Sequence, residues 1–393
     1  MVDTSDQWIV ERTGIRERRL VSPEQATSDL AVEAARRALA DAGARPDEID
    51  LIIVATACPD MLFPSTACLV QRALGAGRAA AFDLSAACTG FIYALAMAEG
   101  AIAAGRADTV LVIAAETLSR ITDYTDRATC VLFGDGAGAV VVRRAPVTQP
   151  PAAPTESVGR PAYPPTATSP AADPPTAGWL GTAPPGLLNA PPGLLSVYLA
   201  ADGTGADLLS LPAGGSRRPA SAETVAARLH YIHMNGPEVF RFAVEAMVRA
   251  VREVLRPLSL RPADVDLLVP HQANARIVDA AVRFLRVPPG KVFHTIEKYG
   301  NISAASLPVS LDEARRQGRL HPGDRVLLVA FGAGMTYGAA VLRWGGPGGC
   351  RTGAGPGAPG GSDPGAGSGA GDSPAAPEQT RLSGSAASGG RSS

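Results

Sequence analysis

The sequence predicts an α/β protein built from two similar halves, and the main evidence is an internal repeat. An amphipathic helical run at Ala31–Leu39 leads into the apolar strand Leu51–Val54, and Ala243–Val251 leads in the same way into Leu267–Pro270. Amphipathic helices that alternate with wholly apolar strands are typical of partly parallel sheets covered by helices on both faces. Helix–strand units look alike in any Ala-rich sequence, so one matched pair alone would be weak evidence for a repeat.

A second pair of matching segments follows in the same order. The apolar strands Val110–Ala114 and Val326–Ala330 are each followed by a glycine-rich turn and another apolar strand, at Gly134–Val142 and Gly332–Val341. Two matched segments in one order favour a duplication. We therefore expect two α/β halves that stack with helices between their sheets.

Further elements are expected in the first half. A strand is expected around Phe82–Leu84, and Phe91–Ala104 follows as a nearly all-apolar helical run that must be buried. The first half is expected to span residues 1–225 and the second half residues 226–344.

Two stretches do not fit a compact core. Residues 146–193 are crowded with Pro, Ala and Thr, which predicts an exposed and mobile insertion within the first half. Residues 345–393 form a Gly/Ser/Pro-rich tail with almost no large apolar side chains, which predicts disorder.

Length, charge and hydropathy exclude several classes of protein. A chain of 393 residues can bury one large core or two medium ones, and a formal net charge of −1 gives no general attraction to nucleic acid or to an anionic membrane. The longest apolar runs, Leu51–Ala57 and Phe91–Ala98, are far shorter than a membrane span. The N-terminus has neither the basic nor the apolar region of a signal peptide. We therefore expect a cytoplasmic protein without membrane or nucleic-acid partners.

The five cysteines indicate neither a disulfide framework nor a metal site, because their number is odd and no CxxC pair occurs. Cys58, Cys68 and Cys130 are interpreted as inert core residues, as apolar free cysteines usually are. Cys350 lies in the predicted tail as an exposed thiol without an evident partner.

Cys88 is the strongest candidate for a catalytic nucleophile. It lies between an apolar strand and the buried helical run, and the small residues Ser85–Ala87 and Thr89–Gly90 leave room for a substrate. The N-terminus of a helix carries partial positive charge, which favours a thiolate over a thiol. Because a thiolate attacks thioesters readily, this position predicts acyl transfer.

His271 and Asn301 are the candidate partners of Cys88 in the second half. His271 follows the strand Leu267–Pro270, at the carboxyl edge where α/β proteins collect ligands. Asn301 lies in Tyr299–Ser306, which by itself also fits a turn leading into a serine-capped helix. Cys, His and Asn in one pocket would form a set for acyl transfer and carbon–carbon bond formation. The other histidines, at positions 230, 233, 294 and 321, are interpreted as surface or capping residues.

A glycine turn at Gly332–Gly334 follows the apolar strand Val326–Ala330. The backbone N–H groups of such a turn can point into a pocket, as an oxyanion hole requires. The turn does not match a phosphate-binding loop, because it lacks the Gly-Lys-Ser/Thr ending.

Six segments together resemble those of the β-ketoacyl-[acyl-carrier-protein] synthase III family. The segments are Asp3–Arg16, Phe82–Phe91 with Cys88, Thr125–Arg127, Phe133–Gly138, Val269–Asn274 and Gly300–Ser306. The similarity runs from Met1 to Trp344 apart from the insertion, and several long motifs in the right order make it highly specific. The resemblance implies a thiolase-type fold, with the two halves stacked in five αβαβα layers. It also implies the enzyme that initiates type II fatty acid synthesis.

By this resemblance, Cys88, His271 and Asn301 are the catalytic residues. Cys88 would attack an acyl-CoA thioester and hold the acyl group. His271 and Asn301 would donate hydrogen bonds to the thioester carbonyl of malonyl-[acyl-carrier protein], stabilising the enolate that forms as CO2 leaves. The enolate would attack acyl-Cys88, while the backbone N–H groups of Cys88 and Ala333 hold the oxyanion. The resemblance implies no cofactor or metal beyond these two thioester substrates.

The resemblance also implies residues that bind coenzyme A. Trp8 and Arg127 would stack on its adenine, and Arg12 would assist them. Arg276 would lie near the mouth of the tunnel, facing coenzyme A or the carrier protein.

Arginines of the second half are candidates for docking the acidic acyl carrier protein, namely Arg241, Arg276, Arg283 and Arg286. A solvated helix face is the alternative interpretation of each of them. A homodimer is expected from the resemblance only.

Three features depart from the family pattern. Relatives begin with an apolar strand upstream of the position that matches Met1, so either the start codon is misassigned or the first half's sheet lacks a core strand. The insertion falls between Val142 and Val197, which the family joins by a short turn. The tail after Trp344 is additional.

Other functions stay open at this level. The same fold can start a polyketide or other secondary-metabolite pathway, or move an acyl group without condensation. A non-catalytic partner subunit is another alternative, although such subunits usually lose the nucleophile that Cys88 provides. The starter acyl group cannot be read from the sequence, because a methyl or two changes binding by only about 1–3 kcal/mol.

Overall fold

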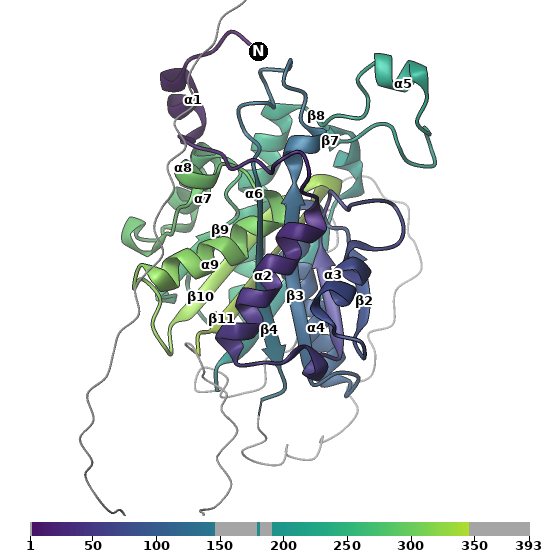
Figure 1. Cartoon of the computed structure of the whole chain (residues 1–393). Helices are drawn as coiled ribbons and strands as arrows, with labels where there is room; N and C mark the ends of the chain where they lie inside the picture. Colours follow the sequence, from purple (N-terminus) through teal and green to yellow (C-terminus); the bar gives the residue numbers. More distant parts are fainter. Residues whose placement is uncertain (1, 146–178, 181–190, 346–393) are drawn as a thin grey trace, which may run out of the picture. The chain divides into compact units, whose positions relative to one another are not determined.

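The structure is a computed structural model that describes residues 2–145, 179–180 and 191–345 (Figure 1). Its first sheet has the strand order β2-β1-β3-β4. The central strand β1 (Leu51–Ala55) pairs in parallel with both β2 (Ala80–Leu84) and β3 (Thr109–Thr117). The last strand, β4 (Asp135–Arg143), pairs antiparallel with β3.

The second sheet repeats this arrangement. Its order is β5-β6-β11-β10-β9. Here β9 (Leu267–Pro270) pairs in parallel with β10 (Arg325–Gly332), which is antiparallel to β11 (Thr336–Arg343). The strands β1, β3 and β4 therefore recur as β9, β10 and β11 with the same relative directions, which confirms the predicted duplication.

Additional strands lie beyond the repeat. β6 (Gly193–Ala201) pairs antiparallel with β11, and the two-residue β5 (Trp179–Leu180) pairs with β6. A separate two-stranded ribbon joins β7 (Leu209–Ser210) to β8 (His233–Met234).

Helices form three layers around the two sheets. The outer face of the first sheet packs against α2 (Thr27–Ala42) and α3 (Thr66–Leu74). Between the sheets lie α4 (Gly90–Ala103) and α9 (Ser306–Arg316). The outer face of the second sheet packs against α6 (Gly236–Leu255) and α7 (Ala275–Leu285). The order αβαβα confirms the predicted five layers. Shorter helices are α1 (Asp6–Thr13), α5 (Ala222–Ala226) and α8 (Ile296–Tyr299).

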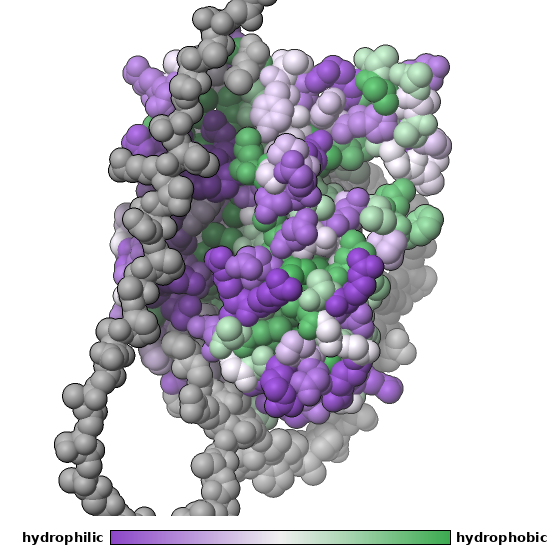
Figure 2. Space-filling view, in the orientation of Figure 1, coloured by the Kyte–Doolittle hydropathy of each residue, from purple (hydrophilic) through white to green (hydrophobic). Residues whose placement is uncertain are grey.

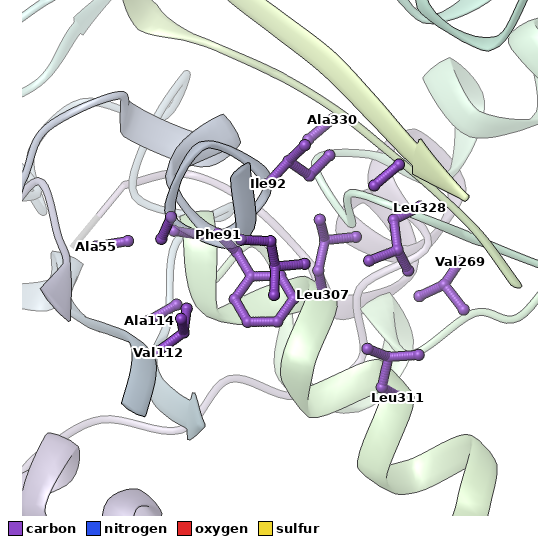
Figure 3. Close-up of a cluster of buried hydrophobic side chains, with 14 of the residues drawn as sticks. Ala55, Phe91, Ile92, Val112, Ala114, Val269, Leu307, Leu311, Leu328 and Ala330 are labelled. Atoms are coloured by element: carbon purple, nitrogen blue, oxygen red, sulfur yellow. The ribbon is translucent and has the colours of Figure 1, made fainter. Parts of the chain in front are cut away.

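The middle layer explains why the strands are apolar on both faces. Phe91 of α4 and Leu307 of α9 pack between strand residues of both sheets, among them Ala55, Val112 and Leu328 (Figure 3). The alternating positions of β1, including Ile52 and Val54, pack on the opposite face with α2 and α3. Side chains of a strand alternate between its two faces, so a strand covered on both sides needs apolar residues throughout.

The predicted boundary between the halves at residue 225 is wrong. Because β6 pairs with β11, residues 193–201 belong to the second sheet and not to the first half. Within the predicted insertion, Trp179–Leu180 forms β5. The rest of the insertion up to residue 190, and the predicted tail from residue 346, lie outside the described residues.

The two sheets differ at one edge. β11 is paired on both sides, whereas within the described residues β4 is an edge strand. Its residues 136–142 are only half-buried, although α2 and α9 both pack against β4. Figure 2 shows hydrophobic residues at the surface in the middle of this face, where Figure 1 places α2 and α9. In the described part of the chain, the first sheet has four strands and the second has five.

Candidate active site

Cys88 lies in a single turn of 3-10 helix, residues 87–89, between β2 and α4. The preceding residue, Ala87, has a positive φ of 45°. The turn lies directly against β10, because a Cβ atom added at Gly332 would lie only 2.7 Å from the backbone nitrogen of Cys88. Glycine at position 332 therefore lets the second half reach the backbone of the nucleophile.

His271 directly follows β9, and its own N–H donates to the Val329 carbonyl (2.8 Å). The side chain is buried, and its Nδ1 forms a hydrogen bond with the Ser306 hydroxyl (2.8 Å). Burial lowers the pKa of His271 to about 3, so the ring is neutral at ordinary pH. Nε2 is buried without a hydrogen-bond partner. When the Ser306 hydroxyl donates to Nδ1, Nε2 carries the hydrogen and can donate it to a ligand.

Asn301 is held in place by its backbone and by its side-chain oxygen. Its N–H donates to the Leu132 carbonyl (2.9 Å), and its Oδ1 accepts from the Ser303 N–H (2.9 Å). This leaves the Nδ2 hydrogens of the side chain to donate elsewhere. Gly300 has a φ of +66°, and a Cβ atom there would lie 2.8 Å from the Leu132 carbonyl oxygen, so the position requires glycine.

One pocket of about 220 Å³ brings the predicted site residues together. Cys88, His271 and Asn301 all line it, as do Trp8, Arg12 and Arg127 from the first half. Its remaining lining is mainly apolar and includes Phe240 and Phe331. A nucleophile, two neutral donors and an apolar wall are suited to a thioester substrate.

Trp8, Arg12 and Arg127 form a cluster on one side of this pocket. The guanidinium of Arg127 lies 5.0 Å from the centre of the Trp8 ring, and that of Arg12 lies 5.7 Å from it. Arg127 also donates to the Asp3 carbonyl (3.1 Å). The cations and the indole already stack on each other, so an adenine base would have to separate Arg127 from Trp8.

The glycine turn after β10 is fastened to the turn that carries Cys88. The Thr336 hydroxyl donates to the carbonyls of Ala86 (3.0 Å) and Ala333 (3.1 Å), and it contacts the Thr89 hydroxyl. Gly332 lines the pocket, and Ala333 follows it in the turn. The backbone of the predicted oxyanion hole is thereby held beside the nucleophile.

The candidate docking arginines lie on the surface of α6 and α7. Arg276, Arg283 and Arg286 are exposed at the two ends of α7, and the Arg276 N–H donates to the capping Asn274 side chain (2.9 Å). Arg241 is exposed on α6 and forms an ion pair with Glu238. None of the four lines the pocket described above, although Asn274 does.

The protonation state of Cys88 differs from the sequence prediction. The pKa of the Cys88 thiol is raised to about 12, mainly by burial and in part by the nearby charge of Glu116, and the Ser303 side chain opposes this shift only partly. A resting thiolate stabilised by the helix N-terminus is therefore not what the site contains, because desolvation outweighs that effect. Glu116 and Ser303 were not identified from the sequence, since a glutamate at the end of an apolar strand gives no signal of its own.

The other cysteines of the described part of the chain, and the other histidines, lie outside the pocket. Cys58 is buried and Cys130 partly buried, but Cys68 is exposed, so its assignment to the core is wrong. His230 forms a hydrogen bond with the Thr224 hydroxyl (2.9 Å), and His233, His294 and His321 are exposed, as predicted.

Within the described residues, no group of three or more His, Cys, Asp or Glu side chains could hold a metal ion. None of the described helices is long and apolar enough to cross a membrane.

Comparison with known proteins points to one family. Residues 82–154 match the model described as 3-oxoacyl-[acyl-carrier-protein (ACP)] synthase III, and residues 255–344 match its C-terminal counterpart. The first match contains Cys88, and the second contains His271 and Asn301.

Individual relatives agree with this match. The chain is 51% identical over 345 residues to β-ketoacyl-[acyl-carrier-protein] synthase III of Symbiobacterium thermophilum. This alignment covers 88% of this chain and 92% of that protein. The crystal structure of the Thermus thermophilus synthase III superposes with a TM-score of 0.71 at 42% identity, covering 88% and 93% of the two chains. The priming β-ketosynthase of the R1128 polyketide pathway superposes with a TM-score of 0.70 at 35% identity, covering 87% and 89%.

The buried neutral His271 predicts a specific dependence of stability on pH. Its folded pKa of about 3 lies below its ordinary value, so the unfolded chain binds a proton that the folded chain does not. The free energy of unfolding should therefore fall as the pH drops below about 6.5, by about 1.4 kcal/mol per pH unit from this group. Urea unfolding between about pH 4.5 and 7.5 should show a shallower loss for His271→Gln than for the wild type. His233→Gln, which changes an exposed ring, is the control; parallel curves for His271→Gln and the wild type would contradict the prediction.

Proposed function

The chain belongs to the β-ketoacyl-[acyl-carrier-protein] synthase III family of acyltransferases, and from this premise we propose how its own residues carry out the family's condensation. The reaction joins an acyl-CoA to malonyl-[acyl-carrier protein] and initiates fatty acid synthesis. The observation that carries the assignment of residues is that Cys88, His271 and Asn301 line one pocket. The products are 3-oxoacyl-[acyl-carrier protein], CO2 and free coenzyme A.

Acylation of Cys88 is the first step. The sulfur attacks the thioester carbonyl of a short-chain acyl-CoA, and the coenzyme A sulfur leaves with a proton. The backbone N–H groups of Cys88 and Ala333 hold the oxyanion of the tetrahedral intermediate, which the close approach of Gly332 to Cys88 supports. Trp8, Arg12 and Arg127 bind the coenzyme A on their side of the pocket.

Condensation is the second step. Malonyl-[acyl-carrier protein] enters the pocket, and its thioester carbonyl accepts hydrogen bonds from His271 Nε2 and Asn301 Nδ2. Loss of CO2 leaves an enolate, whose carbon attacks the acyl-Cys88 carbonyl, and the carbon–sulfur bond to Cys88 breaks. A neutral His271 suits this role, because negative charge on the carbonyl oxygen develops only in the transition state and a fixed neutral donor stabilises it there.

This chemistry needs only the two thioester substrates and no further cofactor. A reducing compartment such as the cytoplasm is consistent with it, because the four cysteines in the described part of the chain are all free.

Priming of a polyketide pathway is the second candidate function. It is supported by the similarity to the R1128 priming enzyme, which shares the fold at 35% identity.

The carrier protein is proposed to dock on the exposed arginines of α6 and α7. Arg276 at the start of α7 follows Asn274, which lines the pocket, so a partner bound there could reach the entrance. Arg283 lies further along α7, and Arg241 lies on α6, which packs against α7. An acidic partner would meet several guanidinium groups on this surface. Arg241 contributes less, because Glu238 already pairs with it.

The enzyme is proposed to be a homodimer formed through the edge of the first sheet. Leu62 and Phe63 are 81% and 84% exposed, and Phe82 of the edge strand β2 is also exposed. The loop and the strand are adjacent, because the Thr66 and Ala67 N–H groups both donate to Asp83 of β2 (2.7 Å). A second copy would cover both the apolar loop and the unpaired strand edge around a two-fold axis.

Acylation can be tested by intact-protein mass spectrometry after mixing the protein with a panel of acyl-CoAs. The wild type should gain one acyl mass, and the preferred adduct identifies the starter group. Cys88→Ala should show no adduct, whereas Cys68→Ala, which removes an exposed thiol, should behave as the wild type. An adduct that survives in Cys88→Ala would refute the assignment of the nucleophile.

Docking can be tested by charge reversal at Arg276 and Arg283. The double variant Arg276→Glu/Arg283→Glu should raise the KM for malonyl-[acyl-carrier protein] by at least about tenfold, since each lost ionic contact is worth about 1 kcal/mol or somewhat more. The rate at which an acyl-CoA with no carrier protein acylates Cys88 should change little in the single variant Arg283→Glu, because, of these two arginines, only Arg276 is also a candidate for binding coenzyme A. Arg106→Glu, on the loop after α4, is the control. An unchanged KM in the double variant would argue against this docking surface.

Dimerisation can be tested with Phe63→Asp in sedimentation velocity experiments. A charge in an apolar interface is costly, so the variant should shift from dimer towards monomer at micromolar concentration. Val225→Asp on α5 is the matched control, because it places the same charge at another exposed apolar residue. A wild-type monomer, or an unshifted Phe63→Asp dimer, would contradict the proposed interface.

A further inference from the structure

The condensation step requires a hydrogen on one particular nitrogen of His271, namely Nε2. A neutral imidazole ring carries only one hydrogen, which can lie on either of its two nitrogens. Nε2 is buried without a hydrogen-bond partner, whereas Nδ1 forms a hydrogen bond with Ser306 Oγ (2.8 Å). The direction of this one hydrogen bond therefore decides whether Nε2 can donate to a substrate.

Ser306 is held in place by the packing of α9 between the two sheets. It is the first residue of α9, and its side chain is buried. Leu307, the next residue, lies in the layer of apolar side chains that Figure 3 shows. Close-packed cores resist displacement, so the start of α9 cannot shift without disturbing this layer. The Ser306 hydroxyl consequently has a fixed position beside the His271 ring.

The His271 ring is also fixed on its other sides. It packs edge-on against the Phe331 ring, with the ring centres 5.5 Å apart and the planes at 65°, which is a favourable geometry for two aromatic rings. The next residue, Gln272, is buried, and its amide donates to the carbonyls of Pro270 (2.8 Å) and Phe293 (3.3 Å). These contacts keep Nδ1 facing the serine hydroxyl.

Counting the hydrogen-bonding groups distinguishes the two directions of the bond between His271 and Ser306. If Nδ1 carried the hydrogen and donated it to Oγ, the serine O–H would have no acceptor among the described residues, and the Nε2 lone pair would also be unsatisfied. If the serine O–H donates to Nδ1, only the Nε2–H is left over. Each buried polar group without a partner costs free energy, so the second arrangement is favoured. His271 lines the pocket, and a substrate carbonyl there can accept the remaining hydrogen.

We propose that Ser306 is a positioning residue that sets the tautomer of His271: its hydroxyl donates to Nδ1 and so keeps the hydrogen on Nε2. The thioester carbonyl of the malonyl group then accepts that hydrogen. As negative charge develops on the carbonyl oxygen, the ring donates more strongly through Nε2, and Nδ1 becomes a better acceptor for the serine O–H. The two hydrogen bonds therefore strengthen each other in the transition state. The inference deepens the proposed function, on which its catalytic part rests.

Nitrogen NMR spectroscopy of protein with isotope-labelled histidines tests the tautomer without any substrate. In the wild type, Nε2 of His271 should carry a hydrogen and Nδ1 should carry none, and the signals that His271→Gln lacks identify this ring. In Ser306→Ala, the Nδ1 signal should move to higher frequency, because the hydrogen bond to its lone pair is lost. A wild-type ring with the hydrogen on Nδ1, or an Nδ1 signal that stays in place in Ser306→Ala, overturns the proposal.

Ser310→Ala is the matched control for this experiment. Ser310 lies one turn further along α9 and is also buried, but its hydroxyl forms a hydrogen bond with Thr295 (2.7 Å) and not with the ring. The variant removes a buried hydroxyl from the same helix, so it should leave the Nδ1 signal of His271 in place. If thermal melting shows that Ser306→Ala is unfolded, the wild-type spectrum and Ser306→Thr, which keeps a hydroxyl, decide.

Kinetics of the two half-reactions separate this role from a merely structural one. In Ser306→Ala, condensation of the acylated enzyme with malonyl-[acyl-carrier protein] should slow about five- to tenfold in kcat with little change in KM, since one hydrogen bond that strengthens in the transition state is lost. Acylation of Cys88 by acyl-CoA, in which the ring does not donate, should change little. Ser306→Thr should restore most of the condensation rate, and Ser310→Ala should keep both rates.

The outcomes also separate this inference from the proposed function. An equal slowing of both half-reactions in Ser306→Ala, or an unchanged condensation rate, would contradict the positioning role. If the wild type is acylated but does not condense, the proposed function fails, and the NMR spectrum still decides which nitrogen of His271 carries the hydrogen.

Discussion

Burial of α4 between the two sheets is the constraint on which the rest of the structure depends. The helix is apolar on nearly every side, so it needs a sheet against each face, and a single half could supply only one. Stacking two halves covers the apolar faces of the helix on both sides and places its N-terminal turn where β2 and β10 both end. The nucleophile is thus positioned by the same packing that forms the core, and Gly332 and Thr336 fasten the second half to it.

Desolvation by this packing sets the chemistry of the pocket. The same burial keeps His271 neutral, keeps the Cys88 thiol protonated at rest and raises the pKa of Glu116 to about 7. Each effect follows from the cost of a charge in a poorly hydrated interior. A neutral donor suits enolate stabilisation, but the protonated thiol requires a proton acceptor nearby. Burial therefore sets the electrostatics of the pocket and leaves the Cys88 thiol protonated at rest.

The sequence alone predicted those strands and site residues that leave a recognisable pattern in a short stretch of the chain. The repeat predicted the two sheets because strands covered on both faces must be apolar throughout, and Cys88, His271 and Asn301 stood out because they follow strands or glycine turns. The boundary at residue 225 failed because β6 looks like any apolar strand, and only its pairing with β11 assigns it to the second sheet. The position of Glu116 near Cys88 could not be found in advance, because only the fold brings these two residues together.

The duplication gives Glu116 a counterpart that clarifies its position. When Val110 of β3 is aligned with Val326 of β10, Glu116 is equivalent to Gly332 in the second half. Both positions adjoin Cys88, but from different halves of the protein. In the second half, the absence of a side chain lets the backbone reach the nucleophile. In the first half, the equivalent position carries a side chain that can accept a proton. The two halves thus share one fold but contribute different groups beside Cys88. The residue at the end of the strand, Glu116 in β3 and Gly332 in β10, makes this difference.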